Sequence, residues 1–268
     1  MPVALSIPAA VRSPGSSPPP ILQTRDLTFG FGGALVTDHV SLEVREGEFV
    51  SLIGPNGAGK TTYFNLLTGL YRPSSGSICF RGREITRTSA AQRAQNGIAR
   101  SFQVSNLFPT LSTHENVRLA AQARHRHRYQ LLRPTSAYEE DIRRADSALE
   151  LVGLRWLAAA PALALSHGDK RKLELAMTIA QDPELVLLDE PTSGVSAADV
   201  PGMVDLIRRI REVEKKTVLM VEHKIGVVRE LSDRIAVLHL GRLLAVGTPD
   251  EIRDNAEVQS AYLGKEEL

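Results

Sequence analysis

A glycine-rich segment that follows a short apolar run has the residue types needed to bind phosphate. The segment reads Gly54-Pro55-Asn56-Gly57-Ala58-Gly59-Lys60-Thr61-Thr62. Gly57 and Gly59 can adopt backbone angles that other residues avoid, so successive N–H groups can converge on phosphate oxygens at a helix N-terminus. Lys60 would place its charge at the β- and γ-phosphates, and the Thr61 hydroxyl would bind Mg2+. This phosphate loop predicts a nucleotide site, the alternative being a glycine turn without a ligand.

Two adjacent carboxylates end a second apolar run. Residues 185–188 are continuously apolar, as in a strand buried on both faces, and Asp189 and Glu190 follow directly. Hydrolysis of a nucleoside triphosphate needs a carboxylate at the metal and a group that polarises the attacking water. Asp189 is therefore predicted to hold the Mg2+ shell, and Glu190 to act as general base. Without the phosphate loop, the same pair could be an exposed acidic strand end.

A third feature is the start of an amphipathic helix at Ser166. Gly168 and Asp169 follow, and apolar residues then recur at helical spacing between Leu173 and Ala180. Ser166 is predicted to cap this helix. A helix N-terminus of this kind can bind an anion, but within one chain the phosphate loop already accounts for the nucleotide phosphates, and no second phosphate is evident. A capping box between Ser166 and Asp169 is the structural alternative, and it is compatible with anion binding.

In chain order, these features resemble an ATP-binding cassette (ABC) ATPase, and the resemblance covers about residues 21–268. The features that carry it are the phosphate loop, Gln103, Leu165-Ser166-His167-Gly168-Asp169, the run ending at Asp189-Glu190, and His223. The family implies ATP as the nucleotide and a head-to-tail dimer of cassettes. In such a dimer, Ser166 and Gly168 of one chain close on the γ-phosphate held by the other chain.

The resemblance also assigns roles at matching positions. Phe31 would stack on adenine, Gln103 would sense metal and water, and His223 would contact the γ-phosphate. Taken alone, Phe31 is a packing aromatic and His223 a strand-end histidine. The expected catalytic residues are Glu190, His223 and Gln103, and the expected metal contacts are Thr61, Gln103 and Asp189. The expected ATP contacts are Phe31, Gly54, Asn56, Gly57, Ala58, Gly59, Lys60, Thr61, Thr62, Ser166 and Gly168.

A closer resemblance is to the ATPase subunits of importers for branched-chain amino acids, urea and short amides. The segments that carry it are Gly97-Ile98-Ala99-Arg100-Ser101-Phe102-Gln103, Leu107-Phe108-Pro109-Thr110-Leu111-Ser112, Val221-Glu222-His223 and Gly247-Thr248-Pro249-Asp250-Glu251-Ile252. ATPases of lipopolysaccharide export share several of them. The resemblance implies a second cassette, identical or paralogous, two transmembrane permeases and, indirectly, a solute-binding protein. Phe108 is predicted to contact a permease helix, the alternative being ordinary packing.

Three positions depart from the family pattern. His167 and Asp169 stand where glycine and glutamine are usual, and Ser196 stands where an aspartate is usual. An acid at the helix start could weaken attraction for an incoming phosphate. The sequence therefore predicts measurable but modest ATPase activity.

Short apolar runs, turn residues and helix-forming segments follow one another along the chain, and they predict the strands and helices that position these residues. The fold class is α/β: a P-loop NTPase core with a mainly parallel sheet and helices, an N-terminal antiparallel β subdomain and an inserted helical subdomain at 104–165. Residues 1–20, rich in Pro and Ser, are expected to be a disordered tail, and residues 21–268 the ABC ATPase domain. Thr248, Pro249 and Glu251 predict a helix that starts with a capping box.

Composition narrows the function further. The net charge of +1 gives no field that would favour nucleic acid, and no stretch approaches the roughly 18 apolar residues of a membrane span. We expect a cytoplasmic chain held at the inner face of the cell membrane through permeases. The basic run 124–128 is interpreted as a solvated face, the alternative being contact with membrane headgroups. A soluble ABC protein of DNA repair or translation is less favoured, because this chain has one cassette and no long heptad array between Thr61 and Ser166. A kinase or GTPase would leave the Ser166 helix unexplained.

Overall fold

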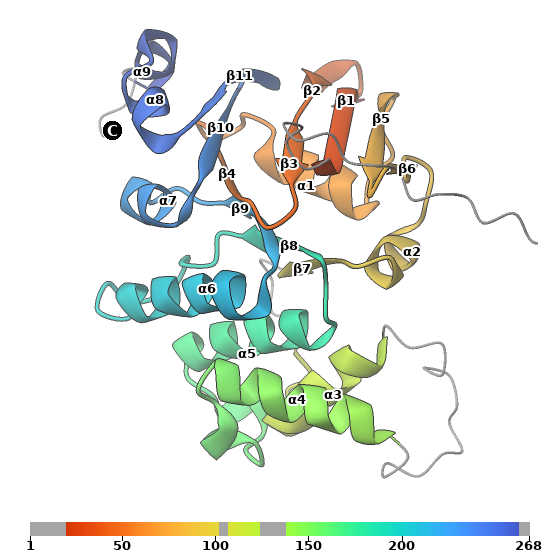
Figure 1. Ribbon diagram of the computed structural model, residues 1–268, viewed down its shortest axis with the longest axis vertical. Helices are drawn as coiled ribbons and strands as arrows, with labels where there is room; N and C mark the ends of the chain where they lie inside the picture. Colours follow the sequence, from red (N-terminus) through yellow and green to blue (C-terminus); the bar gives the residue numbers. More distant parts are fainter. Residues whose placement is uncertain (1–19, 102–106, 124–137, 263–268) are drawn as a thin grey trace, which may run out of the picture.

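The computed structural model describes residues 20–101, 107–123 and 138–262 (Figure 1). Residues 1–19 of the predicted tail, the basic run and Gln103 lie outside the described residues, and Pro20, the last residue of the predicted tail, begins a strand. In the part of the chain that is described, no helix combines the length and the apolar character that a bilayer crossing requires.

A six-stranded sheet forms the centre of the molecule, in the order β11-β10-β4-β9-β8-β7. Its strands are β4 (Phe49–Ile53), β7 (Ile98–Ser101), β8 (Leu185–Asp189), β9 (Thr217–Val221), β10 (Arg234–His239) and β11 (Arg242–Gly247). All pairs are parallel except the β10–β11 hairpin. Every residue of β4, β8 and β9 is buried, because helices and the second sheet cover both faces.

A second, antiparallel sheet, built from residues 20–84, lies beside the first (Figure 1). Its strands are β1 (Pro20–Phe31), β2 (Ala34–Val40), β3 (Glu43–Arg45), β5 (Ser75–Phe80) and β6 (Arg83–Glu84). Helix α1 (Lys60–Thr68) contributes Tyr63, Phe64, Leu66 and Leu67 to a core shared with strands of both sheets. The predicted fold class, including the antiparallel β subdomain, is confirmed.

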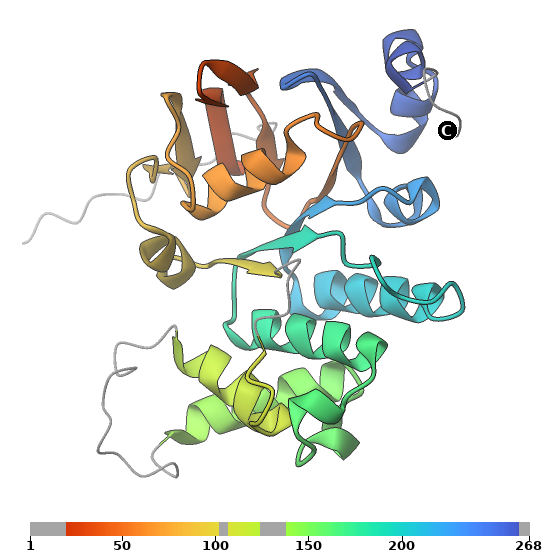
Figure 2. The same ribbon diagram turned by 180° about the vertical axis from the view of Figure 1, so that it is seen from behind.

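Three helices form a separate layer at the far end of the molecule, seen from both sides in Figures 1 and 2. They are α3 (Thr113–Ala123), α4 (Glu139–Leu151) and α5 (His167–Ala180), with short 3-10 turns at Arg155–Leu157 and Ala162–Ala164. The predicted insertion, 104–165, contains α3 and α4. Helix α5 packs on both of these helices, although it begins after residue 165, where the insertion was predicted to end. The domain limits therefore stay a prediction. The remaining helices are α2 (Ala90–Gln95), α6 (Val200–Glu214), α7 (Ile225–Leu231), α8 (Pro249–Arg253) and α9 (Ala256–Tyr262).

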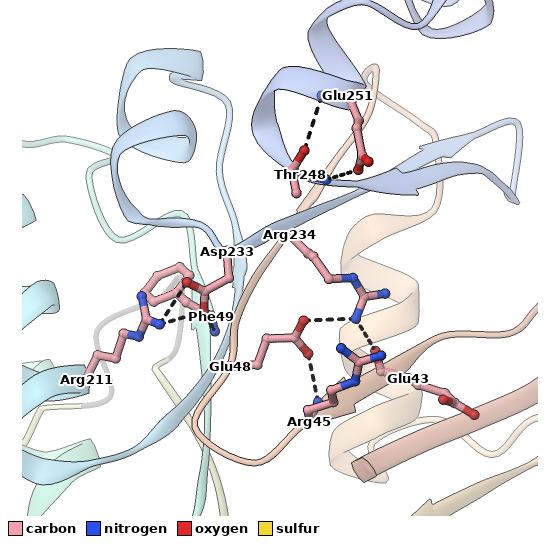
Figure 3. Close-up of polar contacts among 9 residues, drawn as sticks. All are labelled: Glu43, Arg45, Glu48, Phe49, Arg211, Asp233, Arg234, Thr248 and Glu251. Atoms are coloured by element: carbon pink, nitrogen blue, oxygen red, sulfur yellow. Dashed lines mark hydrogen bonds and ion pairs between the residues drawn. The ribbon is translucent and has the colours of Figure 1, made fainter. Parts of the chain in front are cut away.

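Polar contacts hold the amino end of β4, opposite the end that leads into the phosphate loop (Figure 3). The Asp233 carboxylate accepts hydrogen bonds from the Phe49 N–H at 2.9 Å and from Arg211 at 2.6 Å. Beside it, the Glu48 carboxylate accepts one from Arg234 at 2.9 Å. These contacts tie β4 to the loop before β10 and to α6. Figure 3 also shows the predicted capping box of α8, which is confirmed.

Asp233→Ala is expected to lower the free energy of unfolding by about 1–2 kcal/mol, because the N–H of the buried Phe49 loses its acceptor. The measurement is urea-induced unfolding followed by circular dichroism. Asp205→Ala is the matched control, since it removes a surface carboxylate that pairs with Arg208, and exposed pairs contribute at most about 1 kcal/mol. Equal losses in both variants would contradict the anchoring role of Asp233.

Candidate active site

The predicted catalytic residues that the structure describes, Glu190 and His223, lie at the carboxyl ends of strands of the central sheet, on the side that also carries Lys60 and Asp189. β4, β9 and β8 are neighbouring parallel strands, so their carboxyl ends share that side. Lys60 follows β4 through the phosphate loop, Asp189 and Glu190 end β8, and His223 follows β9. Ligands of open α/β sheets bind beyond the carboxyl ends of the strands, which is where these residues lie.

The phosphate loop closes tightly before α1. Gly59 caps the helix with φ of 99°, and a Cβ there would overlap the carbonyl oxygen of Val36 on β2, so both its conformation and its surroundings require glycine. The Tyr63 N–H donates to the Gly59 carbonyl at 2.8 Å. The N–H groups of residues 60–62 precede this first helical bond and are positioned to receive an anion.

Lys60 lies folded into the phosphate loop. Its Nζ donates to the carbonyl oxygens of Gly54 at 2.6 Å and Pro55 at 3.0 Å. Burial lowers the pKa of the Lys60 ammonium, while the Glu190 and Asp189 carboxylates oppose this shift. The two carboxylates are therefore close enough to interact electrostatically with the Lys60 ammonium. The phosphate loop and the end of β8 thus form one charged site.

Asp189 has the surroundings expected of a metal-binding carboxylate. The residue is 1% exposed, and its Oδ2 pairs with the Arg100 guanidinium. Its Oδ1 is buried and has no hydrogen-bond partner among the described residues. A buried carboxylate oxygen without a donor fits a hydrated cation, because oxygen ligands suit Mg2+. The Thr61 side chain, at the start of α1, is exposed.

Glu190 and His223 are brought together by adjacent strands. His223 Nε2 lies 3.0 Å from Glu190 Oε1. Glu190 has φ of 47°, and its N–H donates to the Val221 carbonyl at 2.8 Å, which fixes the turn after β8. The Glu222 carboxylate is buried and accepts hydrogen bonds from the His223 N–H and the Thr192 hydroxyl. These bonds join the segments that follow β8 and β9.

Ser166 and Gly168 lie on a different part of the surface. Ser166 caps α5, as predicted, with its Oγ accepting from the Asp169 N–H at 3.1 Å. The Ser166 hydroxyl donates to the Asp169 carboxylate at 2.7 Å. Asp169, which stands where the family usually has glutamine, is therefore held by the residue that caps the helix. Ser166 and Gly168 line a cavity of about 550 Å³, together with Ser196, and the described lining contains no residue of the phosphate loop.

Phe31 lies at the end of β1 and is 53% exposed. Its ring meets Phe29 and Tyr71 edge to face, at centroid distances of 4.9 and 5.6 Å. Phe29 and Tyr71 stack on each other at 5.2 Å. An exposed aromatic ring supported from behind in this way can present a face or edge to a flat ligand.

Sequence reasoning gave no role to three polar residues in this region. Arg100 contacts Asp189 and Asn65, and Glu222 bonds the segments after β8 and β9. The sequence signals that could have indicated these roles were a charged residue, Arg100, inside the short strand β7 and an acid, Glu222, directly after β9.

Comparison with known proteins identifies the class. The family described as ABC transporter matches residues 37–193, more than half of the chain, and a second family, described as branched-chain amino acid ATP-binding cassette transporter, matches residues 242–267. The chain belongs to the ABC transporter family, and it binds and hydrolyses ATP as a motor subunit of such a transporter. The predicted family is thus confirmed.

A curated relative is the high-affinity branched-chain amino acid transport ATP-binding protein LivG of Salmonella typhimurium. It is 41% identical over 251 residues, covering 92% of this chain and 98% of the relative. A nucleotide-free ATP-binding cassette from an ABC transporter is similar in structure, with a TM-score of 0.78, 25% identity and coverage of 92% and 100%. A dimeric cassette in a post-hydrolysis state, bound to ADP and Pi, has a TM-score of 0.73, 27% identity and coverage of 85% and 98%.

Proposed function

We propose that this chain is the ATPase subunit of an importer for branched-chain amino acids or related amides or urea. The observation that carries the proposal is that the match to branched-chain transport proteins extends over 92% of the chain and includes the segment 242–267. This favours the importer over the lipopolysaccharide-export alternative. ATP binding closes a pair of cassettes, and hydrolysis with phosphate release reopens it.

The geometry supports a division of roles in hydrolysis. When ATP binds, the Lys60 ammonium moves from the Gly54 and Pro55 carbonyls to the β- and γ-phosphates. The backbone N–H groups of residues 60–62 donate to the same phosphates. Asp189 and Thr61 would hold Mg2+, which when bound would supply positive charge to the phosphate oxygens. Glu190 accepts a proton from the attacking water, and His223, within hydrogen-bond distance, orients Glu190 and reaches the γ-phosphate.

The second half of each site comes from a partner cassette. Ser166 and Gly168 sit at the N-terminus of α5, on a surface separate from the phosphate loop. A dimeric relative of the same fold supports a paired arrangement. The partner is a copy of this chain or a paralogue, and two permeases, served by a solute-binding protein, hold the pair at the inner face of the cell membrane.

The permease contact is proposed to include Phe108. Its side chain is 53% exposed, while its backbone is clamped by Asn116, whose side chain accepts from the Phe108 N–H at 2.8 Å and donates to the Phe108 carbonyl at 3.1 Å. Leu163, 68% exposed, lies beside it through a hydrogen bond from its N–H to the Pro109 carbonyl. Exposed apolar side chains on a fixed backbone are typical of a binding surface.

Affinity purification of the tagged chain from gently solubilised native membranes, followed by mass spectrometry, tests the proposal. We expect two permeases of the branched-chain type, with or without a second ATPase chain. Phe108→Asp is expected to lower their yield about tenfold or more, because a charge would be buried at the contact. Leu240→Asp, at the exposed β10–β11 turn, is the control.

Two results would count against this function. Recovery of ribosomal or DNA-repair proteins, with none of the chain in the membrane fraction, would replace the importer by a soluble clamp. A Phe108→Asp variant that recovers permeases as well as Leu240→Asp would remove Phe108 from the contact.

A further inference from the structure

A buried arginine links the three elements that surround the proposed metal site. Arg100, near the end of β7, donates from Nη1 to Asn65 Oδ1 on α1 at 2.6 Å. Its Nη2 pairs with Asp189 Oδ2 at the end of β8. The guanidinium also lies 5.6 Å from the centre of the Phe64 ring. One side chain therefore contacts the helix after the phosphate loop and the strand that carries the metal carboxylate.

Burial makes this ion pair an expensive way to stabilise the fold. The side chains of Arg100 and Asp189 are only 7% and 0% exposed. Removing two charges from water costs free energy that their attraction offsets only when the remaining polar atoms are also bonded. Here Arg100 Nε and Asp189 Oδ1 have no partner among the described residues. Apolar residues of the same size would stabilise the fold at least as well, so the pair points to a role in the site.

The two oxygens of Asp189 have different surroundings. Oδ2 is held by Arg100, which Asn65 in turn holds from α1. Oδ1 is left without a donor among the described residues, although it is buried. A carboxylate fixed through one oxygen cannot rotate to satisfy the other, so Oδ1 keeps its full capacity to accept. This is the arrangement by which partners of a ligating group orient it toward a metal.

We propose that Arg100 is a positioning residue for the magnesium site. Arg100 holds one carboxylate oxygen of Asp189, so that the other oxygen, Oδ1, faces the ligand shell of the cation that binds with ATP. The inference rests on the proposed role of Asp189 at the metal. Asn65 is the second anchor, because it sets the orientation of the Arg100 guanidinium. A change at Arg100 should therefore act on metal-dependent binding of nucleotide more than on binding of the nucleotide itself.

The test compares ADP affinity by calorimetry in excess Mg2+ and in EDTA, and takes the ratio as the metal gain. We expect Arg100→Met to lower this gain about tenfold or to abolish it, since partners of metal ligands typically contribute 10- to 100-fold in metal affinity. Its affinity for ADP in EDTA should stay at the wild-type value. Arg118→Met is the matched control, because Arg118 is also a buried arginine that pairs with a carboxylate, on α3 away from the site.

Further variants keep the outcomes distinct. Arg100→Lys retains the charge but cannot reach Asn65 and Asp189 together, so its metal gain should fall by less than that of Arg100→Met. An unchanged metal gain in Arg100→Met, or in Arg100→Lys if the former does not fold, would overturn the inference. Asp189→Asn should lose the gain. If it keeps the gain, the metal role of Asp189 fails as well; if it loses the gain while the Arg100 variants keep it, only the positioning role fails.

Discussion

Glu190→Gln is expected to slow ATP hydrolysis by the assembled transporter by roughly 100- to 10,000-fold, the usual contribution of a general base. The amide has nearly the shape of the carboxylate but cannot accept a proton from water at neutral pH. The backbone turn at Glu190 is held by its N–H bond to Val221, so the fold should be unaffected. Phosphate release by the complex purified with its permeases is the measurement, with ATP binding measured in parallel and expected to persist.

Glu184→Gln is the matched control for this change. Glu184 lies just before β8, at the opposite end from Glu190, and pairs with Arg81 on the surface. Its neutralisation should leave turnover unchanged. Wild-type complex that hydrolyses ATP no faster than Glu190→Gln would mean that Glu190 is not the base, or that the departures at Asp169 and Ser196 leave the site inactive.

Lys60→Met is expected to weaken ATP binding by about 10- to 100-fold, because hydrogen bonds from a charged group contribute roughly 1.5–3 kcal/mol. The nucleotide-free protein should change little in stability, because two effects oppose each other. Methionine of similar length removes a charge that burial disfavours, as the lowered pKa of Lys60 indicates, but it also removes the hydrogen bonds to the Gly54 and Pro55 carbonyls. Calorimetric titration with ATP and thermal unfolding without nucleotide are the two measurements.

The control for Lys60→Met is Lys216→Met. Lys216, just before β9 and at the other edge of the sheet, pairs with Asp182. This variant should bind ATP as the wild type does. If Lys60→Met unfolds at a lower temperature than Lys216→Met while its ATP affinity is normal, Lys60 is a structural residue and its assignment to the phosphates is wrong.

Local patterns were enough to predict the main elements. The apolar run at 185–188 lies in a strand that is buried on both faces, because a continuous apolar stretch of this length has no solvent side. Ser166 and Thr248 cap helices at the predicted positions, since capping depends on residues only three apart. The roles of individual site residues, including Gln103 outside the described ranges, stay predictions.

Contacts between distant residues could not be predicted in the same way. Arg100 and Asp189 belong to strands that are neighbours in the sheet but far apart in the chain, and Asn65 comes from a third element. Nothing in the local sequence of any of them indicates the other two. The anchoring of Phe49 by Asp233 is of the same kind.

The sequence alone determined which chemical groups this protein carries and which of them end strands or begin helices, because those properties depend on residue types within a few positions. Tertiary structure decided how these groups meet. The order β4-β9-β8-β7 places His223 beside Glu190 and Arg100 beside Asp189, and it sets Ser166 on another surface. The physical reason is that strand order and packing follow from burial of the whole core, so no short segment contains them.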